Sequence, residues 1–248
     1  MKIDHPRFAD LPRLRQLWQA VFGDSDAFLD LFFSTAFSPD HCLCVRLDQQ
    51  IVAAAYWMDC AFFGQTAAYV YAVVTAPVHR GQGHCRRLMD AIHRQLSDDG
   101  YCGSLLVPAE DGLRQMYATM GYRDFGGIEE ASYTAGDTAC QMRSLDPQEL
   151  SILRRQYLPQ GGVVQEGKSL SLLAGLADFY AGENHLLTVS REGNRILECL
   201  GDPNNIPPSL AALGIPQAAV RLPGNQPFAM YRPLKQIPPP TYFAFAFD

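Results

Sequence analysis

Apolar residues recur at helical spacing in two segments near the N-terminus. The first begins after Asp10, an expected N-cap, and ends at Gly23, and the second follows Ser25, another N-cap residue. Apolar side chains three or four residues apart share one face of a helix, so both segments are predicted to be amphipathic helices. We expect the following side chains to be core: Leu14, Leu17, Trp18, Val21, Phe22, Phe28, Leu29, Phe32 and Phe33.

Three segments rich in β-branched and aromatic residues follow, and short polar turns separate them. Residues 42–47, 51–63 and 66–75 are therefore predicted strands. A helical apolar pattern then runs from about Gly83 to Gly100, and a buried strand is expected over 104–109 before a further helix and strand. This order predicts an α/β fold with a mixed sheet flanked by helices.

The character of the chain changes after residue 134. Ten of the 17 prolines lie beyond residue 200, which disfavours long central strands there. The patterns still predict short elements: helices over 147–157, 169–180 and 209–213, a hairpin of 185–191 with 195–200, and strands over 218–222, 228–232 and 242–247. We expect a second, smaller α/β lobe.

The turn between the third strand and the next helix carries the clearest candidate chemistry. Gly81 and Gly83 allow an anion to approach the backbone, and a helix start offers free N–H groups and the positive end of a dipole. A bound anion would also offset the unfavourable position of Arg86 and Arg87 in the first helical turn. The turn is expected to hold a pyrophosphate, although a simple strand-to-helix connection is the alternative. It lacks the Lys-Ser/Thr ending of a P-loop and the third glycine of a dinucleotide site.

The segment resembles the acetyl-CoA-binding core of the GCN5-related N-acetyltransferases, the GNAT family. The family pattern, Val-x-Pro and then Arg/Gln-x-x-Gly-x-Gly/Ala, reads here as Thr75-Ala76-Pro77 and then Arg80 to Cys85. Thr75 and Cys85 depart from it, and both are compact. Downstream, 113–122 looks like the family's L-x-x-x-Y-x-x-x-G-F segment, so the resemblance covers about residues 8–134.

The resemblance implies acetyl-CoA as cosubstrate and assigns roles to named residues. Backbone groups of Val73, Val74 and Thr75 would bind the pantetheine arm, and Tyr117 would donate a hydrogen bond to the coenzyme sulfur; a core tyrosine is the alternative for Tyr117. The expected coenzyme-binding residues are Val73, Val74, Thr75, Arg80, Gly81, Gln82, Gly83, His84, Cys85 and Arg86.

No residue identifies itself as the general base. His41, Asp59, Glu129 and Glu130 are candidates, each more simply explained as a solvated or turn-end side chain. The segments LRQLWQAVFGDSDAFLDLFF and VPAEDGLRQMY resemble the enhanced-intracellular-survival type acetyltransferases. That resemblance implies a C-terminal carboxylate as base, here at Asp248.

Composition excludes several other classes of function. The formal charge of -6 without a segregated basic patch argues against nucleic-acid binding. Seven scattered cysteines without metal-ligand spacing predict reduced thiols and no metal. Without a long apolar run or a signal-peptide core, no membrane association and a cytoplasmic location are expected.

The sequence therefore predicts a GNAT-like acetyl-CoA-binding catalytic domain over 1–134 and a smaller α/β accessory lobe over 135–248. One interpretation of the lobe is a degenerate copy of the first domain, used for substrate shaping or for contacts in a homodimer. We expect an N-acetyltransferase that moves an acetyl group by direct attack of an amine, either a small molecule or a protein lysine. The alternative hypothesis is a noncatalytic acyl-CoA-binding sensor.

Overall fold

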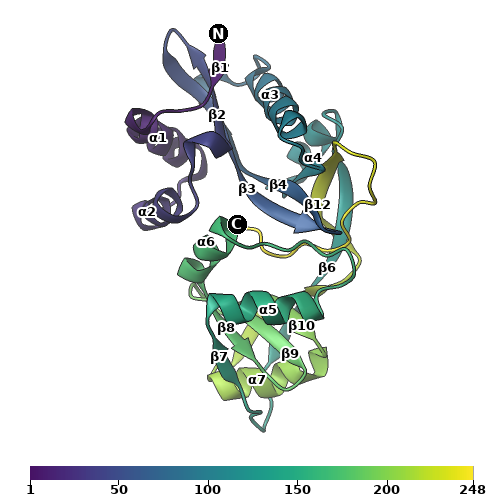
Figure 1. Ribbon diagram of the computed structural model, residues 1–248. Helices are drawn as coiled ribbons and strands as arrows, with labels where there is room; N and C mark the ends of the chain where they lie inside the picture. The colour runs from purple at the N-terminus through teal and green to yellow at the C-terminus, as the bar shows by residue number, and fades with distance from the viewer. Residues whose placement is uncertain (248) are drawn as a thin grey trace. The chain divides into compact units, whose positions relative to one another are not determined.

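The structure, a computed structural model, describes residues 1–247 and divides into two compact units, whose elements are labelled in Figure 1. The chain passes between the units more than once. Unit 1 comprises 1–123, 167–172 and 230–238, and unit 2 comprises 124–166, 173–229 and 239–248.

Unit 1 contains a mixed sheet in the order β1-β2-β3-β4-β5-β12. The first four strands are antiparallel neighbours, β4 and β5 are parallel, and β12 pairs antiparallel with β5 through its last residues, Met230–Pro233. The strands are β1 (Lys2–Asp4), β2 (Cys42–Leu47), β3 (Gln50–Phe62), β4 (Gln65–Thr75), β5 (Gly103–Leu106) and β12 (Gln226–Pro233).

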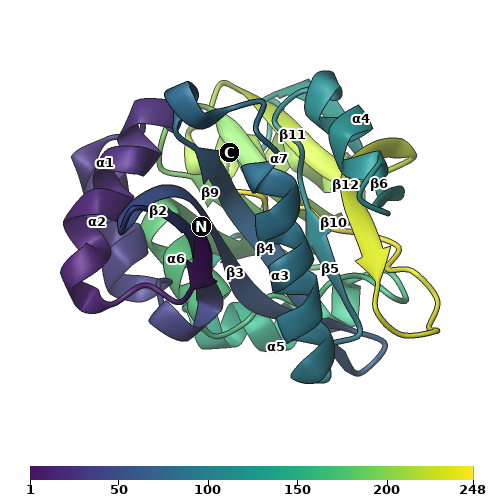
Figure 2. The ribbon, with the colours of Figure 1, turned by 90° about the horizontal axis from the view of Figure 1, so that it is seen from above.

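Two helical layers cover this sheet. On one face lie α1 (Leu11–Phe22) and α2 (Asp26–Thr35), and on the other lies α3 (His84–Asp98), as Figures 1 and 2 show. The stop at Gly23 and the cap by the Ser25 hydroxyl, which accepts from the Phe28 N–H at 3.2 Å, confirm two predicted boundaries. Trp18 packs on Tyr56 with ring centroids 5.2 Å apart. The short helix α4 (Asp111–Ala118) follows β5.

Unit 2 is also an α/β unit, with the strand order β6-β11-β10-β9-β8-β7. Its helices α5 and α7 lie on opposite faces of the sheet (Figure 1). The elements are β6 (Arg123–Thr134, in this unit from Asp124), β7 (Arg143–Leu145), α5 (Pro147–Tyr157), β8 (Ala177–Ala181), β9 (His185–Ser190), β10 (Arg195–Gly201), α7 (Ile206–Leu213) and β11 (Gln217–Pro223); α6 (Lys168–Leu176) begins in unit 1.

The sheet of unit 2 repeats the pairing pattern of unit 1. From β7 to β10 the neighbours are antiparallel, β10 and β11 are parallel with helix α7 between them in sequence, and β6 closes the order antiparallel to β11. In unit 1 the corresponding run is β1 to β4, then α3 and β5, then β12. The predicted mixed α/β fold class is confirmed.

Two predicted elements of the second half are wrong. The helix expected over 169–180 ends at Leu176, because residues 177–181 instead pair as β8 with both β9 and β7. The strand expected over 242–247 does not form, and its described residues share one isolated bridge, between Gly162 and Tyr242. Side chains hold this segment instead, since Arg221 donates to Ala244 O at 2.7 Å and Gln165 to Phe245 O at 2.9 Å.

Within residues 1–247, no helix has both the length and the apolar character needed to cross a lipid bilayer.

Candidate coenzyme site

A β-bulge bends β4 where its predicted binding residues begin. Ala54 pairs with Val74 and Tyr56 with Tyr71, so two residues of β4 stand opposite Ala55. Ala72, inside the bulge, has φ of 49°, a left-handed conformation that is costly for a residue with a Cβ. Such bulges redirect a strand. Nothing in the sequence signals this one.

The parallel pairing of β4 with β5 is short. Within the described residues it covers Ala68 with Ser104 and Tyr69 with Leu105, near the start of both strands. Beyond Tyr69 the edge of β4 toward Val73 and Thr75 therefore has backbone groups without a partner strand on that side. An extended ligand with amide groups can pair with such an edge.

The turn after β4 adopts the conformation that its glycines allow. Gly81 and Gly83 have φ of 74° and 77°, and Gly83 is the N-cap of α3. Because the Arg87 N–H bonds to Gly83 O at 3.1 Å, the N–H groups of residues 84–86 precede the first intrahelical bond and lack helical acceptors. A Cβ at Gly81 would have no neighbour within 4 Å, so the backbone there is open to a ligand. This is the geometry of an anion site.

The arginines around the turn bind protein oxygens. Arg80 Nε donates to Thr75 O at 3.3 Å, Arg87 donates to Gln82 O at 2.8 Å, and Arg86 donates to both oxygens of Thr119. These bonds fix the course of the turn. The two bonds to Thr119, at the end of α4, also satisfy the charge of Arg86, which lies near the candidate anion site. The position of Arg86 in the first turn of α3 therefore does not by itself require a bound anion.

A pocket of about 650 Å³ connects the bulged strand, the turn and α4. It brings together most of the predicted coenzyme residues and Tyr117. Two predicted residues are not part of the lining: Val74 is fully buried, and the side-chain amide of Gln82 donates to Val78 O at 3.4 Å. The lining residues are Val21, Phe22, Val73, Thr75, His79, Arg80, Gly81, Gly83, His84, Cys85, Arg86, Ala109, Glu110, Leu113, Met116, Tyr117 and Met120.

Several lining residues were not predicted from the sequence. The helical pattern predicts that Val21 and Phe22 are core, yet both line the pocket and Phe22 is 43% exposed. His79 and Glu110 bring a second imidazole and a carboxylate to the pocket. Their positions depend on where η3 (Pro77–His79) and the start of α4 lie, which a local pattern does not specify.

Tyr117 lies on α4 with its side chain almost wholly buried, 6% exposed. Its ring meets that of Tyr122 edge-on at 5.7 Å. Burial, and then the neighbouring Cys85 and Tyr122, raise the pKa of the Tyr117 phenol above its ordinary value. The hydroxyl therefore stays protonated at neutral pH and can donate a hydrogen bond into the pocket.

Cys85 lies in the first turn of α3, also in the pocket wall. Burial raises the pKa of its thiol to about 11, although Arg86 opposes this shift. A thiol with such a pKa is almost entirely protonated at neutral pH, and the thiolate is the nucleophilic form. Cys85 is therefore poorly suited to attack a thioester.

The four internal base candidates are found outside this pocket. Asp59 accepts a 2.7 Å hydrogen bond from Tyr101 and pairs in register with Ala68, seven residues before Thr75, and His41 stacks on Trp57. Glu129 and Glu130 belong to unit 2, where Arg221 and Arg195 lower the pKa of Glu130 against the opposing effect of burial. Asp248 lies outside the described residues, so its assignment stays a prediction.

The helix of unit 2 that corresponds to α3 cannot form the same anion site. In α7 the first turn contains Pro207 and Pro208, which have no N–H to donate. Its N-cap, Asn205, has φ of -81°, unlike Gly83, and the nearby Asp202 carboxylate accepts from the Asn204 N–H at 3.0 Å. Of these two helix starts, that of α3 therefore offers free N–H groups and that of α7 does not.

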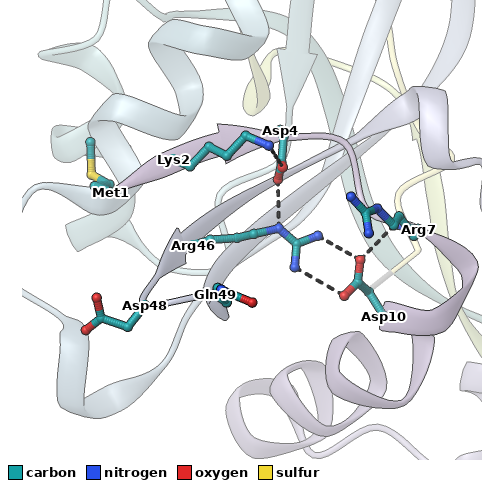
Figure 3. Close-up of a pocket in the computed structure, with 8 residues that line it drawn as sticks. All are labelled: Met1, Lys2, Asp4, Arg7, Asp10, Arg46, Asp48 and Gln49. Atoms are coloured by element: carbon teal, nitrogen blue, oxygen red, sulfur yellow. Dashed lines mark hydrogen bonds and ion pairs between the residues drawn. The ribbon is translucent and has the colours of Figure 1, made fainter.

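A second cavity in unit 1, of about 530 Å³, lies beside β1 and β2. Figure 3 shows that Arg46 bridges two carboxylates there: its Nε donates to Asp4 at 2.8 Å, and its terminal nitrogens donate to Asp10 at 2.7 and 3.1 Å. Asp10 is the N-cap of α1, as predicted, but its side chain makes no cap bond and accepts instead from the Arg7 N–H. These ion pairs connect the N-terminal segment to strand β2.

No cluster of three metal-ligating side chains occurs among residues 1–247, and the seven cysteines are free thiols.

Comparison with known proteins gives consistent results. Residues 2–125 match the family model described as an acetyltransferase (GNAT) domain. A GCN5-related N-acetyltransferase from Kribbella flavida is 17% identical, with 94% of this chain and 72% of that chain covered and a TM-score of 0.71. Eis1 from Mycobacterium abscessus is 11% identical, with 95% and 74% covered and a TM-score of 0.67.

A GCN5-related N-acetyltransferase from Anabaena variabilis is 14% identical, with 94% and 73% covered and a TM-score of 0.72. At these identities the three structures establish a shared fold across nearly the whole chain. A search of curated protein sequences gave no significant match.

Proposed function

Because the chain belongs to the GNAT acetyltransferase family, as its motifs predicted, we propose that it transfers an acetyl group from acetyl-CoA to an amine by direct attack. The observation that carries the proposal is the single pocket in which the bulged strand, the glycine turn and Tyr117 meet. Acetyltransferase activity is the family's chemistry. The residue roles, the mechanism and the acceptor are the proposal.

The residues present fit the coenzyme. The helix-start N–H groups of residues 84–86 are suited to its pyrophosphate. The edge of β4 at Val73 and Thr75, which β5 does not pair with, is suited to the amide groups of its pantetheine arm. Bound acetyl-CoA supplies the activated thioester. In this assignment residues 80–86 hold and orient the coenzyme, and Val74 contributes only its backbone groups.

We assign Tyr117 the role of hydrogen-bond donor to the leaving sulfur. Its raised pKa keeps the phenol protonated, and full proton transfer to a thiolate with an ordinary pKa near 8.5 is uphill. Donation to the negative charge that develops on sulfur needs no such transfer and lowers the barrier. Burial strengthens this interaction because bulk water screens it less.

Direct attack is supported by the state of Cys85. It is the cysteine that lines the pocket, and its thiol pKa of about 11 disfavours a thiolate that would accept the acetyl group. The amine nitrogen is then the nucleophile: it bonds to the thioester carbon, the carbon–sulfur bond breaks, and the sulfur leaves with the electron pair. Cys85→Ala should retain turnover, and the wild type incubated with acetyl-CoA should show no acetylated Cys85 by mass spectrometry.

The acceptor amine must lose a proton for this reaction. A lysine-like amine with pKa about 10.4 costs about 4 kcal/mol to deprotonate at pH 7.4. We keep Asp248 as the proposed base, and its deletion should lower kcat. We propose an acceptor of either class, a small-molecule amine or a protein lysine.

We also make a proposal for the origin and the role of the accessory lobe. The pairing pattern of unit 2, which includes β6 and matches that of unit 1, supports a degenerate GNAT-like copy in the second half of the chain, proposed over 135–248. The prolines of α7 explain why this copy would lack a coenzyme site. We propose that it shapes the acceptor site or forms a homodimer, which light scattering would test. The free thiols agree with a cytoplasmic location.

A panel of polyamines, aminoglycosides and lysine peptides tests the function. Release of free thiol from acetyl-CoA is measured with each amine, and the acetylated product is identified by mass spectrometry. We expect amine-dependent thiol release and initial rates that require both substrates to be bound together. Thiol release without any acetylated amine would contradict the proposal.

A further inference from the structure

His84 is the first residue of α3, and its position is unusual for a polar side chain. The ring is 6% exposed, yet it forms part of the wall of the coenzyme pocket. Its Nδ1 is buried and has no hydrogen-bond partner within the described part of the chain. Buried ring nitrogens are normally paired, so this atom indicates a missing ligand or water.

The other ring nitrogen has a weak partner. His84 Nε2 lies 3.4 Å from Gln82 Oε1, an acceptor, so Nε2 carries the proton when the imidazole is neutral. In that tautomer Nδ1 is a bare acceptor. It stands at a helix start, where the backbone offers N–H donors and the dipole is positive.

The charges around His84 favour this neutral form. Arg87 on α3 and His79 on η3, whose ring centroid is 6.3 Å away, lower its pKa together with the larger effect of burial. Arg80 and Arg86 add positive charge to the same pocket, and Glu110 is the lining carboxylate on the α4 side. The ligand-free pocket is therefore predominantly cationic without a charge on His84.

An anion in the pocket would instead favour the protonated form of His84. We propose that His84 is a coenzyme-binding residue that takes up a proton when the coenzyme binds, so that Nδ1–H donates to a phosphate oxygen. Protonation then gives the buried Nδ1 of His84 a hydrogen-bond partner and adds a cation beside the pyrophosphate. This inference rests on the proposed coenzyme site and adds a proton to its binding reaction.

Isothermal titration calorimetry of the full chain tests the proton directly. Dephospho-coenzyme A is titrated at pH 6.5 in buffers of different ionisation enthalpy, because it retains the pyrophosphate but lacks the phosphate monoester that titrates near neutral pH. We expect uptake of up to about one proton per bound molecule in the wild type. His84→Gln should lose that uptake and bind about tenfold or more weakly.

His41→Gln is the matched control. His41 also has a buried Nδ1 without a partner among the described residues, and burial lowers its pKa too, but it is outside the pocket lining. Its variant should keep the uptake and the affinity of the wild type. His79→Gln tells whether the second imidazole of the pocket accounts for the proton instead, an outcome that would overturn the proposal.

The pH dependence gives a second measurement that needs no variant. Since binding raises the pKa of His84, affinity is highest below the pKa of the free protein. It falls by up to about tenfold per pH unit until the pKa of the complex is passed. Should His84→Gln not fold, NMR titration of the labelled His84 ring replaces it, with an upward pKa shift expected on binding.

The outcomes separate the two claims. An unmoved His84 pKa, or binding without proton uptake, would overturn the role of His84 and leave the coenzyme site intact. Absence of any coenzyme binding by the folded wild type would contradict the proposed function itself.

Discussion

Arg86 donates two hydrogen bonds to Thr119, one to its backbone carbonyl at 3.2 Å and one to its hydroxyl at 2.6 Å. The bond joins the first turn of α3 to the C-terminal end of α4, two residues after Tyr117. A cation at a helix C-terminus is favourable, so Arg86 is stabilised by α4 while it stands at the unfavourable end of α3. The turn at Gly81 and Gly83 and the helix that carries Tyr117 are therefore directly connected.

This connection predicts an effect of Thr119→Val. The substitution removes the hydroxyl that Arg86 binds and that itself donates to Met116 O at 2.7 Å. We expect a stability loss of about 1 kcal/mol and a several-fold lower kcat with nearly unchanged coenzyme affinity. Ser34→Ala, which removes an exposed helix hydroxyl of α2, is the control and should leave kcat unchanged. An equal loss in both variants would argue against the connection.

Tyr117→Phe tests the donor role. Because the ring remains, coenzyme affinity should be nearly unchanged, stability should fall by about 1 kcal/mol or less, and turnover should slow by about 10- to 1000-fold. Tyr101→Phe removes a hydroxyl that binds Asp59 and should keep full turnover. Full activity of Tyr117→Phe would reduce Tyr117 to a core residue.

Gly83→Asp should abolish coenzyme binding. The new carboxylate stands at the N-cap of α3, where it accepts from the N–H groups that the phosphate needs and repels the anion. Gly64→Asp is the control, since Gly64 also has a positive φ but lies in the turn after β3. A Cβ at Gly64 has no neighbour within 4 Å, and one at Gly83 meets only the end of the Arg87 side chain, at 3.4 Å. Both variants carry similar backbone strain, and affinity should be lost in the first alone. Equal affinities would identify the turn as a connector.

The Arg46 bridge predicts a pH-dependent contribution to stability. Burial raises the pKa of Asp4, but hydrogen bonds from Lys2 and Arg46 and their charges lower it overall. Hydrogen bonds from Arg46 lower the pKa of Asp10 against the opposing effect of burial. Lowered pKa values stabilise the fold fully above the unfolded value near 3.8, and the stabilisation is lost as pH falls through the folded values. Arg46→Met should therefore cost about 1 kcal/mol at pH 7 and progressively less below pH 3.8, as measured by urea unfolding. A difference independent of pH would assign the loss to packing.

Local patterns predicted much of unit 1. The helices after Asp10 and Ser25 and the three strands that follow have strong periodicity and clear boundaries, and they form as expected. The errors fall where tertiary contacts override a local pattern. Residues 177–181 continue an apolar helical spacing but find strand partners on both sides, and 242–247 alternate without a strand to pair with.

The candidate site shows the same division. Gly81 and Gly83 were predictable because a turn of this kind requires residues without a Cβ. The bulge at Ala72 was not, since alanine rarely adopts φ of 49° and only the fixed register of β3 and β4 reveals it. Nor could sequence spacing place Glu110 and Phe22 in the lining of one pocket, because that depends on how α1 and α4 pack in unit 1.

Titration of acetyl-CoA into the full chain, followed by calorimetry and by thermal unfolding, tests the central claim most directly. With the site in unit 1 intact and the α7 start of unit 2 blocked by Pro207 and Pro208, we predict one bound molecule per chain. The fold should gain about 2.7 kcal/mol at a ligand concentration 100 times Kd. A stoichiometry of two would contradict the assignment of unit 2, and a melting temperature indifferent to acetyl-CoA with no heat of binding would contradict the coenzyme site itself.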